Sequence, residues 1–139
     1  MKPSLKYREG LAEARRIVVK IGTRVLVRKT GQPDMRRICA LVKGLAALNH
    51  GGYEVAMVTS GAIGAGMEAL GMRSRPTSLP DLQMAAAVGQ SRLMARYDKL
   101  FSAEGCIVGQ VLLTRDDFLH KLRLTNARRT IANLLRNNV

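Results

Sequence analysis

This sequence of 139 residues is poor in aromatic residues and has few cysteines. Aromatic side chains make up 4% of it and tryptophan is absent, so few rings are available to stack on unpaired nucleic-acid bases. The two cysteines have no C-x-x-C spacing and fit reduced, buried thiols of a cytoplasmic protein better than a disulfide framework. No apolar run approaches the roughly 18 residues of a membrane span. The charged N-terminus is not a secretory signal. We therefore expect a globular, cytoplasmic chain without a membrane partner.

Acidic residues are also scarce, with 10 against 23 basic ones, a net charge of +13 and an isoelectric point near 10.9. Such a charge raises the hypothesis of a nucleic-acid-binding module. The basic residues are scattered over 2–16, 73–75 and 115–136, however, and form no single dense stripe. A solvated basic surface is the favoured interpretation, and a nucleic-acid module stays open as the less favoured one.

Strand and helix patterns alternate along the chain and predict an α/β fold with a mostly parallel sheet. We expect strands at 16–22, 53–59 and 106–113, of which the first has the continuous apolar pattern of a strand buried on both faces. Helices are expected at about 34–48, 62–70, 80–104 and 114–136. Asp34 is expected to cap the first of them, the glycines at 51–52 to end it, and residues 114–117 to cap the last one. Residues 1–15 form a basic lead-in. Because one valine follows the last helix, the sequence predicts a truncated domain whose return strand is missing.

Residues 58–66, with the sequence VTSGAIGAG, form the most informative motif. A β-branched run ends in small residues and three glycines, which suits a turn from a strand into a helix. The free N–H groups and positive dipole end of such a helix bind carboxylates or phosphates. The glycine order differs from the dinucleotide fingerprint and the P-loop. From this motif alone, anion binding and close packing by Gly61, Gly64 and Gly66 are equally good explanations.

Lys20 lies near the carboxyl end of the first expected strand, and Gly22 and Thr23 follow it. Ligands of open α/β sheets bind at these strand ends, where a lysine places a positive charge on phosphate oxygens. Alone, Lys20 is better explained as a side chain that extends from a strand end into solvent. Together with the glycine-rich strand end at Ser60, it favours a phosphate site.

Both strand-end motifs, 18–23 (VVKIGT) and 58–66, resemble the amino acid kinase family, and most of all its members that phosphorylate glutamate. Segments 85–93, 109–114 and 124–128 agree, so the resemblance covers residues 16–139. It implies a three-layer αβα sandwich and ATP-dependent phosphorylation of the γ-carboxylate of L-glutamate to glutamyl 5-phosphate, the first step of proline biosynthesis. A kinase part of a bifunctional pyrroline-5-carboxylate synthetase, or another carboxylate kinase, remains an alternative.

The resemblance also implies roles for particular residues. Lys20 is expected to be catalytic and to contact the transferring phosphoryl group, and Gly22 and Thr23 to line the nucleotide phosphates. Ser60, with the backbone of Gly61 and Ala62, is expected to bind glutamate. No residue of this chain is expected to ligate a metal.

Family members use ATP with Mg²⁺, are inhibited by proline and form homo-oligomers, which we expect to involve the helix at 80–104. Arg24 departs from the small serine usual after the Gly-Thr pair. The acidic segments, second catalytic lysine and glycine-rich nucleotide loop of the family are expected beyond Val139. Residues 16–139 would then be a glutamate-binding part without the ATP lobe, and an inactive fragment by themselves.

Overall fold

The structure is a computed structural model that describes residues 13–26 and 33–139. Most of the expected lead-in at 1–15 therefore lies outside the described residues, as do the side chains of Thr23 and Arg24. The elements, in chain order, are β1 (Arg16–Ile21), α1 (Thr23–Leu26), α2 (Met35–His50), β2 (Glu54–Thr59), α3 (Ala62–Ala69), α4 (Leu79–Ala103), α5 (Arg115–Leu119) and α6 (Lys121–Arg136).

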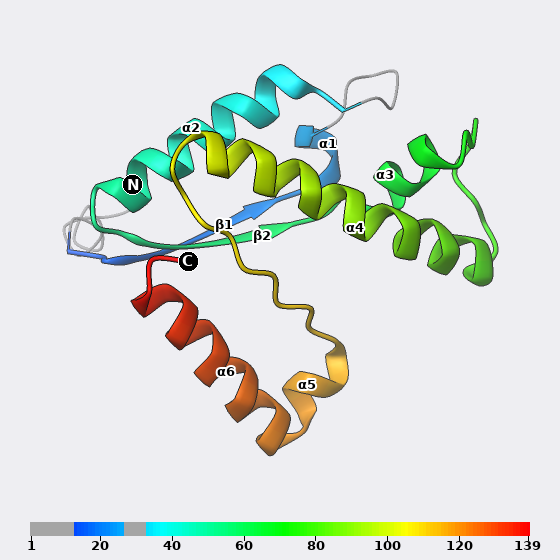
Figure 1. The fold of residues 1–139 in the computed structure, drawn as a ribbon. Coiled ribbons are helices and arrows are strands. Elements are labelled where there is room, and N and C mark those ends of the chain that lie inside the picture. Colours follow the sequence, from blue (N-terminus) through cyan, green and yellow to red (C-terminus); the bar gives the residue numbers. More distant parts are fainter. Residues whose placement is uncertain (1–12, 27–32) are drawn as a thin grey trace, which may run out of the picture.

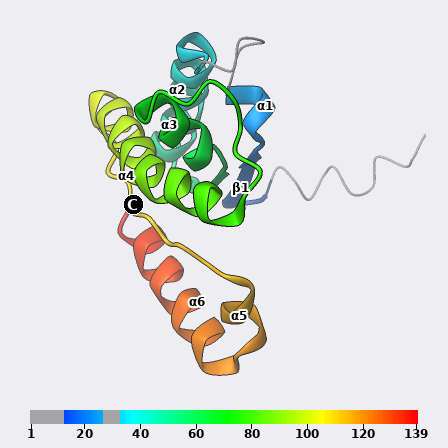
Figure 2. The same ribbon diagram turned by 90° about the vertical axis from the view of Figure 1, so that its right-hand side faces the viewer.

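β1 and β2 pair in parallel, in a register that sets Lys20 beside Val58 and Ile21 beside Thr59. Helices α2 and α4 cover one face of this two-stranded sheet, and α6 lies on the other side and contacts β2 (Figures 1 and 2). The α/β class and the parallel sheet are confirmed, with helices on both sides of the strands. Both strands end at the same edge of the sheet, as parallel pairing requires.

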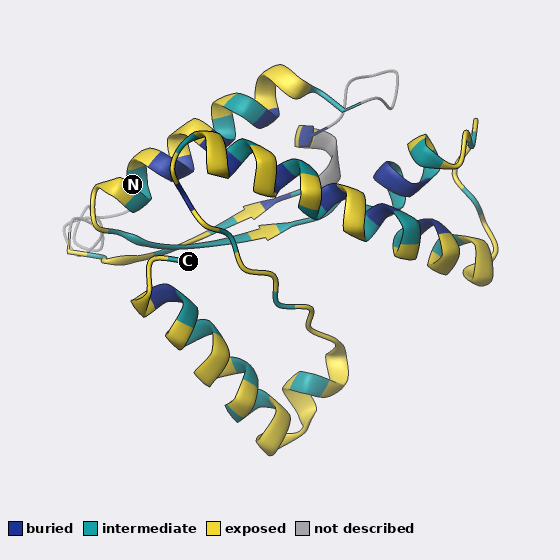
Figure 3. Cartoon of the chain, in the orientation of Figure 1, coloured by how far each residue is buried: buried dark blue, intermediate teal, exposed yellow. Residues whose placement is uncertain are grey.

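The core lies between the sheet and the helices α2 and α4, where the buried residues gather (Figure 3). Helix α2 buries its apolar stripe there through Ile38, Val42 and Leu45. As predicted, Asp34 caps this helix, because its carboxylate accepts a hydrogen bond from the backbone N–H of Arg37 at 3.3 Å. The glycine stop is confirmed at Gly52, whose φ of +85° suits glycine.

Helices α3 and α4 pack against each other through two glycines. A Cβ built on Gly66 would lie 1.7 Å from the carbonyl oxygen of Ala85, and one on Gly89 would lie 1.7 Å from that of Ala62. Only glycine fits at either position, so the backbones of the two helices come into direct contact. Helix α4 begins where predicted, with Ser78 as its N-cap and Pro80 in its first turn.

Three expectations about the elements are wrong. Residues 106–113 lie in an extended segment without strand pairing, and Ile107 and Leu112 are about 70% exposed there. β1 is buried on one face only, since Val18 is 64% exposed in a sheet whose second face is largely open. The last helix is divided at His120, whose N–H bonds to Asp116 and whose carbonyl accepts from Leu124, so that it caps both α5 and α6.

Helix α5 begins with a capping box, in which Thr114 and Asp117 bond reciprocally. The backbone N–H and the hydroxyl of Thr114 both donate to the Asp117 carboxylate and hold its pKa below the usual range. The predicted cap at 114–117 is therefore confirmed, although the helix that it begins is short.

Candidate functional site

The two predicted strand-end motifs meet at one edge of the sheet. The backbone N–H of Ser60 donates to the carbonyl of Ile21 at 3.3 Å, which extends the β1–β2 pairing by one step. The Ser60 hydroxyl donates to the same carbonyl at 3.2 Å. Ser60 therefore ties the end of β2 to the end of β1, directly beside Lys20.

After Ser60 the chain turns into α3 through Gly61, whose φ of +126° is accessible to glycine but strained for other residues. Helix α3 then begins at Ala62, and the Gly61 carbonyl accepts its first helical hydrogen bond from Ala65 at 2.9 Å. The first N–H groups of a helix have no partner within it and carry the positive end of the helix dipole. Ser60, Gly61 and Ala62 thus form a turn suited to a carboxylate.

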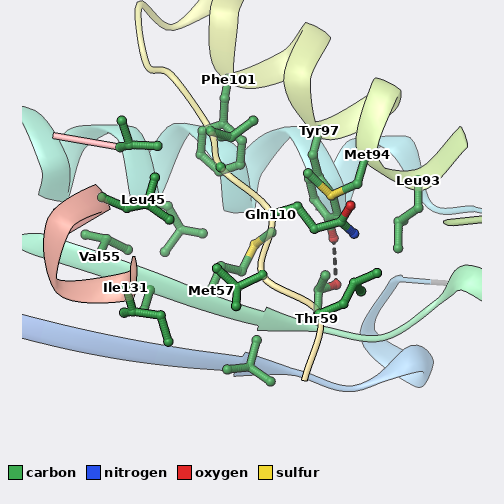
Figure 4. Close-up of a pocket in the computed structure, with 18 of the residues that line it drawn as sticks. Leu45, Val55, Met57, Thr59, Leu93, Met94, Tyr97, Phe101, Gln110 and Ile131 are labelled. Atoms are coloured by element: carbon green, nitrogen blue, oxygen red, sulfur yellow. Dashed lines mark hydrogen bonds between the residues drawn. The ribbon is translucent and has the colours of Figure 1, made fainter. Parts of the chain in front are cut away.

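This turn forms one end of a cavity of about 620 Å³ between β2, α4, the 106–113 segment and α6 (Figure 4). The described side chains that line it are mainly apolar, among them Leu45, Met57, Leu93, Met94, Phe101 and Ile131, and none is charged. The body of the cavity therefore does not suit the charged groups of an amino acid with two carboxylates. The end of the cavity at Ser60, Gly61 and Ala62 suits a carboxylate, because backbone N–H groups bind anions without a side-chain charge.

Tyr97 joins helix α4 to this turn. It is 2% exposed, and its hydroxyl lies 2.9 Å from Oγ1 of Thr59 (Figure 4). Burial raises the pKa of the Tyr97 phenol above its usual value of about 10, against smaller lowering effects of the Thr59 hydrogen bond and the Arg96 charge. The sequence analysis did not assign this residue to the site. A tyrosine in an apolar helix stripe was the available signal, since a buried phenol needs a hydrogen-bond partner.

Lys20 is exposed and, because side chains alternate along a strand, lies on the face opposite Ile21. Its neighbour there is Val58, whereas Thr59 and Tyr97 lie on the α4 side. Neither Lys20 nor Gly22 lines the cavity. A Cβ on Gly22 would meet nothing within 4 Å, so there is open space at this strand end. The roles of Lys20, Gly22 and Thr23 stay predictions.

The described residues contain no group of three or more histidine, cysteine, aspartate or glutamate side chains that could hold a metal ion. They do not fit a Mg²⁺ ion ligated by protein side chains alone. Cys39 and Cys106 are both free thiols, as predicted. Of the helices described, none is long and apolar enough to cross a membrane.

These features define an α/β protein with a turn from strand to helix, at Ser60, Gly61 and Ala62, at the carboxyl ends of two parallel strands. The model of the amino acid kinase family matches residues 15–139, and the chain belongs to that family. A glutamate 5-kinase of Moorella thermoacetica is 49% identical over 129 residues, which are 93% of this chain and 34% of that protein.

Two further similar proteins also have the name glutamate 5-kinase. The protein of Citrifermentans bemidjiense is 48% identical over 92% of this chain and 34% of its own length. The protein of Clostridium tetani is 42% identical over 92% of this chain and 48% of its own length. The chain thus spans about a third to a half of the curated relatives that it matches. The resemblance read from the two strand-end motifs is confirmed.

Proposed function

We propose that this chain is the glutamate-binding part of an enzyme that transfers the γ-phosphoryl group of ATP to the γ-carboxylate of L-glutamate, as in proline biosynthesis. The observation that carries the proposal is the turn at Ser60, Gly61 and Ala62, which closes one end of a cavity beside a second strand end. Its support in sequence is the identity of 42–49% to relatives named glutamate 5-kinase.

In this proposal the substrate carboxylate accepts hydrogen bonds from the backbone N–H groups of Gly61 and Ala62. Ser60 binds the substrate together with these N–H groups, and its hydroxyl also donates to the carbonyl of Ile21, which holds the turn against the end of β1. Lys20 donates to the transferring phosphoryl group and offsets its developing charge, with Gly22 and Thr23 on the nucleotide side. Mg²⁺ would accompany the ATP phosphates and does not depend on a ligand from the described residues.

Residues 16–139 then act as the substrate-binding part, and residues 1–15 as a basic lead-in. We infer that the 139-residue polypeptide by itself shows no phosphoryl transfer. We also infer a cytoplasmic location, in agreement with its free thiols, and homo-oligomerisation and inhibition by proline in the complete enzyme. A hydroxylamine trap for the acyl phosphate measures transfer directly, and hydroxamate formation by the isolated chain would contradict the inference of inactivity.

Glutamate binding tests the site. We expect Ser60→Ala to weaken L-glutamate binding to the chain about tenfold in isothermal titration, because the substrate loses a polar partner and the turn loses its tie to β1. Ser91→Ala is the matched control, since the Ser91 hydroxyl donates to its own helix, at the carbonyl of Val88. Equal affinities of wild type and Ser60→Ala would refute this assignment.

Turnover tests Lys20 in the complete enzyme. We expect Lys20→Ala to lower kcat at least a hundredfold with little change in glutamate affinity, because its charge acts on the transferring group. Lys43→Ala, which removes an exposed lysine of α2, controls for the change in net charge. A kcat that falls no further in Lys20→Ala than in Lys43→Ala would contradict the catalytic role.

A further inference from the structure

Two hydrogen bonds in series connect Tyr97 of helix α4, through Thr59, to Ser60 in the turn before α3. We call this series of hydrogen bonds the relay. The Tyr97 hydroxyl lies 2.9 Å from Thr59 Oγ1, and Thr59 Oγ1 donates to the Ser60 carbonyl oxygen at 3.1 Å. A threonine hydroxyl has one proton, and here that proton is used towards Ser60. Tyr97 must therefore be the donor in its bond to Thr59, so the relay has a defined direction from α4 to Ser60.

This direction fixes a peptide plane of the site. In a trans peptide the carbonyl and the following N–H point in opposite directions. When Thr59 holds the Ser60 carbonyl, the Gly61 N–H therefore points away from the Thr59 hydroxyl. Gly61 cannot impose this orientation by itself, since glycine tolerates a wide range of backbone angles and here has a φ of +126°.

The Tyr97 end of the relay is held firmly. The ring is 2% exposed and packs on Phe101 with centroids 6.3 Å apart. The same helix contacts the far side of the turn, where Gly89 lets its backbone approach the carbonyl of Ala62. Helix α4 thus holds the turn at two points, one before Gly61 and one after it.

We propose that Tyr97 is a positioning residue for the carboxylate-binding turn: its hydroxyl acts through Thr59 to orient the Ser60–Gly61 peptide and to aim the Gly61 N–H at the bound anion. The identity of that anion, L-glutamate, rests on the proposed function. Tyr97 itself need not touch the substrate.

The test compares Tyr97→Phe, Thr59→Val and the double variant with Tyr53→Phe, which alters a half-buried tyrosine outside the relay. L-Glutamate affinity is measured by titration, and the Gly61 amide is followed by ¹H–¹⁵N correlation spectra. We expect about fivefold weaker binding and a shifted Gly61 amide in each single variant, with no further loss in the double variant. Thr59→Ser keeps the hydroxyl and is expected to bind as wild type does.

Two results separate this proposal from the proposed function. If wild type binds L-glutamate and Tyr97→Phe and Thr59→Val bind it equally well with an unshifted Gly61 amide, the positioning role is wrong and the function stands. If wild type binds no L-glutamate while both variants shift the Gly61 amide, the relay orients the peptide as proposed and the assigned substrate is wrong.

Discussion

Three glycines that look equivalent in the motif have different physical roles at the scale of the residue. Gly61 provides a backbone angle, Gly66 allows a close approach to Ala85, and Gly64 has nothing within 4 Å of a built Cβ. The sequence left anion binding and packing as equal explanations. In the structure, Gly66 serves helix packing and Gly61 serves the turn. The sequence pattern does not distinguish these roles, because they depend on the backbone angle of Gly61 and on the Ala85 backbone beside Gly66.

Tyr97 gives a pH-dependent prediction. Because burial raises its pKa, the folded state holds the phenolic proton more tightly than the unfolded chain does. This stabilising contribution is complete below the unfolded pKa of about 10 and is lost as the pH rises through the folded pKa. We expect Tyr97→Phe to lose less stability than wild type between about pH 9.5 and 11, as measured by urea unfolding. Parallel pH profiles for the two proteins would contradict the assignment.

At the scale of the element, helix boundaries were predictable where local chemistry decides them. Asp34 caps α2 as predicted, because a side-chain acceptor before an amphipathic pattern acts within one turn. The start of α4 near Pro80 was also predicted, although its N-cap, Ser78, was not. The break at His120 and the short helix α1 were missed. Neither has a strong local signal, and each depends on how the neighbouring backbone continues.

Helix packing is tested by a glycine pair on α3. We expect Gly66→Ala to lower the free energy of unfolding by about 3 kcal/mol or more, since its Cβ would collide with the Ala85 backbone carbonyl. Gly64→Ala, two residues away on the same helix, is expected to be neutral or to add up to about 1 kcal/mol. Urea unfolding with equal m-values measures both, and a Gly66→Ala variant as stable as Gly64→Ala would refute the close contact.

At the scale of the whole molecule, the alternation of strand and helix patterns in the sequence predicted that β1 and β2 pair in parallel. Parallel pairing then brings their carboxyl ends together. The expected strand at 106–113 did not form. An apolar, β-branched run favours extended backbone, but a strand also needs a partner edge, and this segment lies along the cavity without pairing to β2. Contacts between residues distant in sequence, such as Tyr97 and Thr59, could not be predicted either, because hydrophobic periodicity describes single elements and not how they pack.

The net charge of +13 gives a prediction for the molecule as a whole. In the described residues the ion pairs are few and exposed, for example Arg16 with Glu54 at 2.6 Å and Arg96 with Glu68 at 3.3 Å. We expect any binding to duplex DNA to be weak, independent of sequence and lost by about 200 mM salt. Sequence-specific binding that persists at this salt concentration, measured by fluorescence anisotropy, would instead support the nucleic-acid alternative.

The most direct measurement of the central claim is an amide-resolved titration of the ¹⁵N-labelled chain with L-glutamate. We expect saturable shifts at Gly61 and Ala62, with smaller shifts at Ile21 and Thr59 and none at Gly64, because the carboxylate binds the backbone at the start of α3. D-Glutamate and L-glutamine serve as matched ligands and are expected to bind more weakly. Saturating L-glutamate that leaves the Gly61 and Ala62 amides unmoved would contradict the account.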